Sequence, residues 1–418
     1  MPSPKPQTIS VRDEIADLIP KRDYVTHSFD KYPAKMIPQL ARFGIEECTS
    51  RGGRVLDPFC GCGTVLVESR LSGRKATGID VNPYATLLAH AKSGLYRKGA
   101  LLQSVKNTVR LVRGKGEVGK ETPDWIDYWF ENETLNQLTA LRKAVNEQSD
   151  SLPRKYLHAL KAILAVAVRL SSKADPRSPK PFISKRARKR RVGKVFDALS
   201  IYEEQGEAFA EAAAEFRELV KDGRRVPVAV ECADASEPGQ GKGDRKKYDA
   251  VVSSPPYLSA QDYYRSSKLE ITVLALLSQE EMEALGPVIL GSGRGRTDTE
   301  AMGKVDSIPL PAEVEKLSKE YTREANVVAT YISNLSNVVQ NCYDNYLKED
   351  GKCCLVIGDS TIRGIRMPVH KWVIGIAEQA GLTFTNHYKD GVKDRRLPPK
   401  REGHSSVIRY EHILIFEK

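Results

Sequence analysis

The residues best suited to chemistry lie in a short arm at 254–257 with the sequence Ser-Pro-Pro-Tyr. Val251 and Val252 precede the arm and predict a buried strand. That strand must stop at the prolines, because proline has no N–H for a sheet ladder and fixes its own φ. Each proline also keeps the residue before it extended. The arm therefore presents the Ser254 hydroxyl, backbone carbonyls and the Tyr257 ring in fixed relative positions, as a holder for a flat polar group.

Such a holder suits transfer of a group to the exocyclic amino nitrogen of a nucleobase. The lone pair of this nitrogen is delocalised into the ring, so acceptors on its two hydrogens and a stacked aromatic ring could raise its reactivity. Ser254 and the carbonyl of Ser254 or Pro255 are the candidate acceptors, and Tyr257 is the candidate stacking ring. The alternative is a proline turn with a half-buried tyrosine, and a partner motif is needed to decide between the two.

The partner motif is a glycine-rich stretch at 54–64, with the sequence R-V-L-D-P-F-C-G-C-G-T. It predicts a short strand, a tight turn and then a helix over 65–70. Glycines let a backbone pass close to a ligand, and the start of a helix offers free N–H groups. A second predicted strand ends at Asp80, about twenty residues after the loop, where nucleotide-type cofactors have their ribose hydroxyls held.

The details of this loop exclude two other kinds of nucleotide site. No Lys-Ser or Lys-Thr follows Gly63, which excludes a phosphate-binding P-loop. Leu66 stands where a dinucleotide loop of the G-x-G-x-x-G type needs its third glycine. The loop therefore fits an uncharged or cationic nucleoside better than a phosphate.

Taken together, the two motifs resemble those of the amino-methylating DNA methyltransferases, which use S-adenosylmethionine and make N4-methylcytosine or N6-methyladenine. The similarity covers residues 24–95 and 226–418. Beyond the two motifs, it rests on three further groups of segments. The segment of the family that wraps the methionine end of the cofactor resembles residues 27–29 and 32–38. The run after the family's catalytic loop resembles residues 263–265, 268–270 and 290–295, and its C-terminal half resembles residues 356–360, 395–398 and 411–416.

The resemblance implies a role for individual residues. The target base would be held by Ser254, Pro255, Pro256 and Tyr257. The methyl group would pass from sulfur to nitrogen in one displacement, with positioning supplying much of the catalysis and no dedicated general base. Only a flipped-out base could reach such a site. The residues expected around S-adenosylmethionine are His27, Ser28, Lys35, Asp57, Phe59, Gly61, Gly63, Thr64, Asp80 and Asp234.

Ser254 favours cytosine N4 as the target, because the adenine-N6 members of the family mostly carry Asp or Asn at this position. Adenine N6 stays the main alternative. An RNA substrate is less expected, since such enzymes usually carry an added RNA-binding domain and the roughly 25 residues before the cofactor segment leave no room for one. A catalytically inactive DNA-binding module would show a damaged loop or arm, and both are intact. No Pro-Cys dipeptide occurs, which argues against the cysteine route to 5-methylcytosine.

The motif order predicts a doubly wound α/β fold with a mostly parallel sheet and a largely helical insertion. The strands before the glycine loop and before the arm would lie side by side where the strand order reverses, the usual crevice for ligands. Residues 24–95 form the first, cofactor-binding part and residues 226–418 the second, catalytic part. Residues 96–225 carry helical spacing of apolar residues and would form the insertion, a possible target-recognition region. The loop after Ser292 is a second candidate for that role.

A net charge of +11 and a pI near 9.1 are compatible with an anionic partner, here DNA. The sharpest basic run lies at 185–191 and, in isolation, predicts a mobile loop; its alternative role is a solvated basic face. Trp125 and Trp129 are expected on one helical face, in core packing rather than base stacking. The residues expected to contact DNA phosphates are Lys185, Arg186, Arg188, Lys189, Arg190 and Arg191.

The cysteines and the remaining sequence place the protein in the cytoplasm. Seven cysteines give no disulfide framework, no His/Cys spacing suggests a metal site, and all seven are expected to be small buried residues. No secretory signal or membrane-spanning run is found. A cognate restriction endonuclease is a possible partner, and the oligomeric state is left open.

Overall fold

The structure is a computed structural model that describes residues 7–9, 11, 23–30, 32–33, 35–114, 119, 121–178, 180–220, 226–237, 248–258, 263–288, 290, 311–392 and 408–418, apart from the side chains of residues 8, 263, 264, 287 and 288. Two segments singled out in the sequence, the loop after Ser292 and residues 395–398, lie outside this range, as do residues 291–295 of the run after the catalytic loop.

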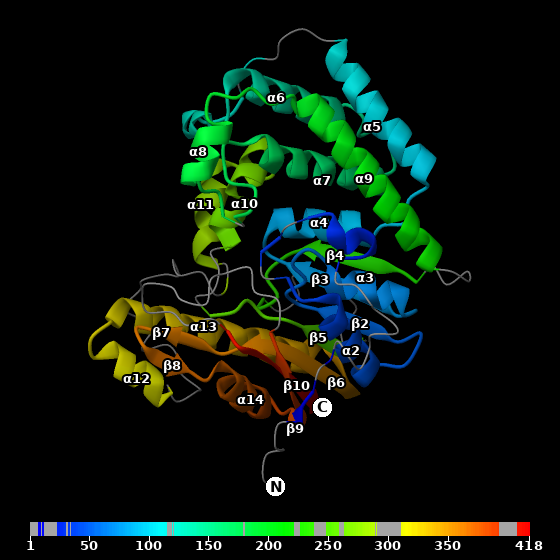
Figure 1. The fold of residues 1–418 in the computed structure, drawn as a ribbon. Coiled ribbons are helices and arrows are strands. Elements are labelled where there is room, and N and C mark those ends of the chain that lie inside the picture. The colour runs from blue at the N-terminus through cyan, green and yellow to red at the C-terminus, as the bar shows by residue number, and fades with distance from the viewer. Residues whose placement is uncertain are drawn as a thin grey trace.

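An eight-stranded sheet, in the order β1-β9-β10-β6-β5-β2-β3-β4, forms the centre of the α/β part (Figure 1). Only β10 runs antiparallel to its neighbours, β6 and β9. The doubly wound, mostly parallel sheet is therefore confirmed. The strands are β1 Gln7–Thr8, β2 Arg54–Asp57, β3 Lys75–Asp80, β4 Val228–Cys232, β5 Tyr248–Ser253, β6 Leu347–Gly358, β9 Thr383–Gly391 and β10 Tyr410–Glu417.

The expected neighbours β2 and β5 do pair, with Leu56 opposite Val251. The chain leaves β2 toward β3 on one side and continues from β5 to β6 on the other, so the strand order reverses between them. The glycine loop follows β2 and the Ser-Pro-Pro-Tyr arm follows β5. Because parallel strands end at the same edge of a sheet, both motifs lie at one carboxyl edge, as the sequence predicted.

Both faces of the sheet are covered, because side chains alternate along each strand. Val55 packs with α2, whereas Leu56 packs on the opposite face with α13 and α14. A small hairpin of β7 and β8 follows β6. The elements of this part are η1 Val25–Ser28, α2 Pro38–Cys48, α3 Thr64–Leu71, α4 Pro83–Ser93, α12 Ala312–Ser318, α13 Thr322–Asn341, η3 Cys342–Tyr346, β7 Ser360–Ile362, β8 Ile365–Met367 and α14 Val369–Gln379.

A second, helical lobe packs on α4 beside the sheet (Figure 1). Its core takes apolar residues from the stretch 96–225 and also from two helices that follow the arm. Trp125 and Trp129 are half-buried against this core, in and directly after a 3-10 helix. The elements are α5 Lys98–Arg113, η2 Asp124–Tyr128, α6 Asn132–Asn146, α7 Arg154–Ser171, α8 Lys185–Arg191, α9 Ala198–Leu219, α10 Tyr263–Val273 and α11 Gln279–Val288.

Two expectations about this chain are wrong. The basic run at 185–191 forms the helix α8 rather than a loop, because the Ser184 hydroxyl caps it by accepting from the Ala187 N–H at 3.0 Å. Cys232 is exposed at the end of β4, whereas the other six cysteines are buried.

Within the described residues, none of the helices is both long and apolar enough to cross a membrane.

Candidate active site

The glycine loop after β2 takes a shape that only small residues allow. Gly61 and Gly63 have φ values of +48° and +86°, in the left-handed region. A Cβ on Gly63 would also meet the Ala89 Cα at 2.9 Å, so the loop lies directly against α4. Gly63 is the N-cap of α3, and no side chain caps this first turn. The N–H groups at the start of α3 are therefore available to a ligand.

Asp80, at the end of β3, fixes the shape of this loop through its carboxylate. One carboxylate oxygen accepts from the Gly61 N–H at 2.9 Å and the other from the Asn82 N–H at 2.8 Å. Burial raises the pKa of Asp80 to about 6, against the opposing effect of these two hydrogen bonds. Each oxygen keeps a further lone pair, which can accept from a ribose hydroxyl.

Asp57 joins the glycine loop to the Ser-Pro-Pro-Tyr arm. Its side chain is buried, and one oxygen accepts from the Ser253 hydroxyl at 2.6 Å and from the Phe59 N–H at 3.2 Å. Burial raises the pKa of Asp57 to about 7; the Asp80 carboxylate adds to this rise and the two hydrogen bonds oppose it. Ser253 is the last residue of β5, directly before the arm. Asp57 thus holds the two motifs in register.

The arm itself is held beyond Ser253 by the strands on its other side. The Tyr257 hydroxyl donates to a carboxylate oxygen of Glu411 in β10 at 2.8 Å, and the Ser360 hydroxyl donates to the Leu258 carbonyl at 3.0 Å. Ser254, Pro256 and Tyr257 are half-buried and Pro255 is buried. All four predicted base-holding residues therefore lie together at the end of β5, next to the end of β2.

The segment at 24–38 packs against the glycine loop, but its polar side chains bond within the segment and to the helices beneath it. The Tyr32 ring would lie 3.5 Å from a Cβ on Gly61. The Ser28 hydroxyl donates to the Val25 carbonyl at 3.0 Å, and the Lys35 ammonium donates to the His27 carbonyl at 2.7 Å. These bonds fold the segment into a compact turn beside the loop.

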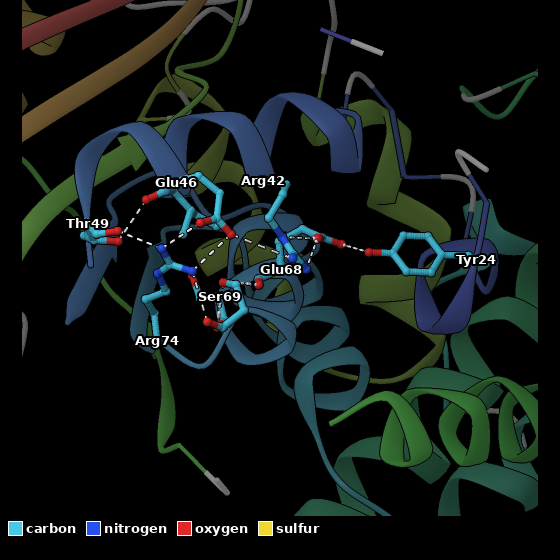
Figure 2. A network of polar contacts seen from close by, with 9 residues as sticks. Tyr24, Arg42, Glu46, Thr49, Glu68, Ser69 and Arg74 are labelled. Carbon is cyan, nitrogen blue, oxygen red and sulfur yellow. Dashed lines mark hydrogen bonds and ion pairs between the residues drawn. The ribbon is translucent and has the colours of Figure 1, made fainter. Parts of the chain in front are cut away.

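His27 lies in a buried polar network rather than at an open surface. Its Nε2 is 2.7 Å from Glu68 of α3, whose carboxylate also receives the Tyr24 hydroxyl and Arg42 of α2 (Figure 2). Burial lowers the pKa of His27, and the neighbouring Glu68 carboxylate opposes this effect. The network continues from Arg42 through Glu46 to Arg74. Glu68 therefore connects the segment at 24–38, through Tyr24 and His27, and α2, through Arg42, to the helix α3 that begins at the glycine loop.

A second buried pair lies directly under the loop. The Lys92 ammonium of α4, fully buried, is 2.5 Å from the Asp30 carboxylate and 3.3 Å from the Cys62 sulfur. Burial alone would raise the pKa of Asp30, but the charges of Lys92 and Lys35 outweigh it and lower this pKa to about 2. The ion pair connects the wrapping segment, the glycine loop and α4.

The remaining predicted cofactor residues lie at the same edge of the sheet. Phe59 is half-buried against the sheet core, and Thr64 is buried at the start of α3. Asp234 follows β4, and its carboxylate accepts from the Ser236 N–H at 2.8 Å and hydroxyl at 2.7 Å. β4 pairs with β3 so that Cys232 lies opposite Asp80, which brings Asp234 near the end of β3.

The six predicted DNA-contacting cations lie on α8, away from this edge, and they do not all have the same environment. Five are exposed. Arg191 is half-buried: it donates to the Ser172 carbonyl at 2.9 Å and to the Leu170 carbonyl, and its guanidinium lies 4.3 Å from the Phe196 ring centroid. Arg191 therefore attaches α8 to the C-terminal end of α7.

One set of side chains among the described residues has metal-ligand chemistry: Asp359, His370 and His412, whose ligand atoms lie within 4.8 Å of one another. The two imidazole rings are parallel, with centroids 3.9 Å apart. A metal ion must lie in the plane of each imidazole that binds it, and two parallel planes cannot share one ion. In this arrangement the set is a hydrogen-bonded stack, in which His370 Nδ1 is 2.6 Å from Asp359.

Sequence reasoning missed several residues that shape the site: Asp30, Glu68, Lys92, Ser253 and Glu411. Two of them carried a signal. Glu68 and Lys92 each interrupt an apolar helical stretch, V-L-V-E-S and L-A-H-A-K, and a charged residue at such a position is usually buried with a partner. Ser253 and Glu411 carried no local signal.

The residues at this edge fit S-adenosylmethionine. The left-handed glycines bring backbone close to a ligand, and the uncapped start of α3 suits its carboxylate. Asp57, Asp80 and Asp234 would supply carboxylates for ribose hydroxyls and for the positive charge of the ammonium and sulfonium groups. When bound, the cofactor supplies the methyl group.

The raised pKa values of Asp57 and Asp80 predict a pH-dependent affinity for this cofactor. Both carboxyls bind protons in the free protein below about pH 7 and 6, respectively. A cationic ligand favours the carboxylates, so binding releases protons and the Kd should fall as pH rises through 6 and 7, by about tenfold for each pH unit over which a full proton is released. Isothermal titration calorimetry between pH 5.5 and 8 measures this.

S-adenosylhomocysteine, whose sulfur is neutral, is the matched ligand and should show a smaller pH dependence. Asp57→Asn should flatten the part of the profile near pH 7. An affinity for S-adenosylmethionine that is constant or weakens with rising pH would contradict the assignment of these carboxylates to the cofactor site.

Comparison with known proteins agrees with the geometry. Residues 11–90 match the N6/N4 methyltransferase family, described as DNA methylase. The type II methyltransferase M.MvaI from Kocuria varians is 22% identical over 434 residues, which cover 94% of this chain and 91% of that protein. The type II methyltransferase M.BsoBI from Geobacillus stearothermophilus is 24% identical over 281 residues, which cover 60% of this chain and 53% of that protein.

Among solved structures, a TehB-like SAM-dependent methyltransferase from Corynebacterium glutamicum aligns over 93% of this chain and 89% of its own, with 10% identity and a TM-score of 0.30. The fold assignment stands on the strand order itself. The glycine loop, the arm at the end of the neighbouring strand, and the similarity to the family model, M.MvaI and M.BsoBI support an amino-methylating DNA methyltransferase that uses S-adenosylmethionine.

Proposed function

We propose that this protein is a site-specific DNA methyltransferase that methylates the exocyclic N4 amino group of cytosine in a flipped-out base. The observation that carries the choice of base is Ser254, a neutral hydroxyl at the first position of the arm, where adenine-N6 members mostly carry Asp or Asn. Cytosine N4 and adenine N6 both present two amino hydrogens, so Ser254 and the adjacent carbonyls serve as acceptors for either base. The proposal extends to a restriction-modification setting with a cognate endonuclease.

The roles of the arm follow from how it is held. Ser254 and the Ser254 or Pro255 carbonyl would accept the two amino hydrogens and so orient the nitrogen lone pair toward the methyl group. The Tyr257 ring would stack on the base and position it. Because Asp57 bonds Ser253 at 2.6 Å, the arm and the glycine loop are in a fixed relation before either ligand arrives. Such preorganisation supports transfer in one displacement without a general base.

The helical lobe is proposed to bind the DNA around the flipped base, and α8 is the part best placed to contact phosphates. Arg191 fixes α8 on the C-terminal end of α7. Arg169 near the same end donates to Glu270 of α10 at 2.7 Å, and α10 follows the catalytic arm in the chain. Figure 1 shows α8, α10 and α11 together at one side of the lobe. The basic helix therefore lies on the side of the lobe to which the arm leads.

Replacing the exposed cations of α8 by alanine should flatten the salt dependence of DNA binding. Each phosphate contact that is lost lowers the slope of log K against log salt by about 0.9. Fluorescence anisotropy with a labelled unmethylated duplex at several salt concentrations measures the slope. The variant carries Lys185→Ala, Arg186→Ala, Arg188→Ala, Lys189→Ala and Arg190→Ala.

Arg191→Ala is the matched control for that variant. It removes a cation of the same helix, but one bonded to carbonyls of α7, so it should lower the melting temperature and leave the slope within one phosphate contact of the wild type. A slope that does not change in the five-residue variant would return α8 to a solvated basic face.

The choice of base is tested by expressing the protein in a bacterial host that lacks DNA methylation and sequencing its genomic DNA with a method that detects modified bases. The proposal expects N4-methylcytosine in one recurring sequence context. N6-methyladenine in a recurring context would keep the fold and the mechanism but overturn the use of Ser254. Unmodified DNA together with a methylated RNA base would overturn the DNA substrate.

A further inference from the structure

The Ser-Pro-Pro-Tyr arm is held at both of its ends by hydrogen bonds from serine side chains. Its two prolines cannot donate backbone hydrogen bonds, so the sheet ladder cannot hold it. Side chains hold it instead. Ser253 donates to Asp57 at the start of the arm, and Ser360 donates to the Leu258 carbonyl at its end. Between these two points, the Tyr257 ring needs a contact of its own.

That contact comes from the last strand of the chain. The Tyr257 hydroxyl donates to the Glu411 carboxylate at 2.8 Å, across 154 residues of sequence. Glu411 is the second residue of β10 and lies opposite Gly358, the last residue of β6. Glu411 and Gly358 therefore lie side by side at the same end of the sheet as the arm, next to the end of β5.

Because Gly358 has no side chain, the Tyr257 ring can approach the backbone of β6 closely. A Cβ on Gly358 would lie 3.2 Å from the Tyr257 Cε2 and 3.0 Å from two carbon atoms of Ile408. The edge of the Tyr257 ring therefore lies against Gly358 of β6, and its hydroxyl is bonded to Glu411 of the neighbouring strand β10. These two contacts, at one ring edge and at the phenol oxygen, restrict rotation of the ring about its long axis and movement of its end, and part of the side chain stays exposed, since Tyr257 is half-buried.

We propose that Glu411 is a positioning residue for methyl transfer, which orients the Tyr257 ring for stacking on the target base. The inference rests on the proposed stacking role of Tyr257 and adds the residue that sets the ring's plane. A charge-assisted hydrogen bond from a phenol to a carboxylate is among the stronger ones that a protein can use to fix a ring. Glu411 itself does not touch the base and acts through Tyr257.

The test is a double-mutant cycle on full-length protein, with initial rates measured by transfer of labelled methyl groups from S-adenosylmethionine to unmethylated plasmid DNA. Tyr257→Phe removes the hydroxyl and keeps the ring, and Glu411→Ala removes the acceptor. Each should lower kcat about tenfold, the usual effect of losing a hydrogen bond to a charged group, with the KM for S-adenosylmethionine unchanged. The double variant should be no slower than either single variant, because both remove the same interaction.

Two further variants separate positioning from general stability. Glu411→Gln keeps an oxygen that can accept from Tyr257 and should recover kcat to within about threefold of the wild type, given that charge assistance roughly doubles the strength of a hydrogen bond. Glu417→Ala removes an exposed carboxylate at the other end of β10 that pairs with Lys352 at 2.8 Å, and it should leave kcat unchanged.

The results that would overturn the proposal are distinct from failure of the proposed function. If wild-type protein methylates DNA but the two losses multiply in the double variant, Tyr257 and Glu411 act independently and the proposal is wrong. It is also wrong if Glu411→Gln is as slow as Glu411→Ala, or if Glu411→Ala raises the KM for S-adenosylmethionine. If wild-type protein does not methylate DNA at all, the proposed function fails first. Should Glu411→Ala not fold, Tyr257→Phe combined with Glu411→Gln supplies the same comparison.

Discussion

Tyr257→Ala is expected to lower the rate of DNA methylation at least about a hundredfold and to leave the affinity for S-adenosylmethionine unchanged. Stacking of a base on an aromatic side chain is worth about 1–3 kcal/mol, and a misplaced reacting group costs further rate. The ring contacts Gly358 of β6 and Glu411 of β10, whereas the cofactor loop follows β2. Its loss should therefore affect the base and not the cofactor.

Rates with unmethylated DNA and calorimetric titration with S-adenosylmethionine measure the two halves of this prediction separately. Tyr257→Trp keeps a flat ring and should retain more activity than Tyr257→Ala. Undiminished methylation by Tyr257→Ala would contradict the stacking role. A loss of cofactor binding in the same variant would place the ring in the cofactor site instead.

Lys92→Met is expected to be the most destabilising single substitution near the site, at about 3–5 kcal/mol, the usual cost of breaking a buried ion pair by removing one partner. It leaves the buried Asp30 carboxylate, 2.5 Å from the missing ammonium, without its main counter-charge. Because the pair also touches Cys62 of the glycine loop, affinity for S-adenosylmethionine should fall with stability. Urea unfolding followed by circular dichroism measures the stability.

The stability that the Asp30–Lys92 ion pair contributes should depend on pH. The folded pKa of Asp30 is lowered from 3.8 to about 2, so the pair stabilises the fold above pH 3.8 and this contribution is lost as pH falls toward 2. The difference between wild type and Lys92→Met should shrink over that range. Asp30→Asn combined with Lys92→Met should recover most of the stability at neutral pH, because no unpaired charge remains.

Lys98→Met is the control for the loss of a lysine. Lys98 forms an exposed ion pair with Glu211, and removing such a pair costs at most about 1 kcal/mol. If Lys92→Met is no less stable than Lys98→Met at neutral pH, the pair does not hold the wrapping segment and the loop together.

The sheet and the two motifs could be predicted because their signals are local. A β-branched run that ends in Gly-rich or Pro-rich residues specifies both a strand and its end, as at Asp57 and Ser253. The order of the motifs along the chain then specifies which strands are neighbours in a doubly wound sheet. Ser254 and Tyr257 follow from the arm alone, without knowledge of their surroundings.

The contacts that hold the site could not be predicted, because they join residues that are distant in sequence. Ser253 and Asp57 are 196 residues apart, and Tyr257 and Glu411 are 154 apart. Which side chains meet depends on strand register, and a shift by one residue would turn Glu411 to the other face of the sheet.

The basic run at 185–191 shows a different limit. Its like charges disfavour a helix in isolation, but two contacts with residues outside the run stabilise α8. The Ser184 hydroxyl caps its start, and Arg191 bonds to carbonyls at the end of α7. The charge run and the Pro-rich stretch before it therefore predicted a loop, where a cap and a tertiary contact stabilise a helix.

The most direct test of the account is to incubate purified protein with S-adenosylmethionine and unmethylated DNA, digest the DNA to nucleosides and identify the products by mass spectrometry. We expect N4-methylcytosine, formed by wild-type protein and reduced by Tyr257→Ala. N6-methyladenine would contradict the role given to Ser254, and DNA without any methylated amino group, in a reaction where S-adenosylmethionine binds, would contradict the central claim that the glycine loop and the arm form one site for DNA amino methylation.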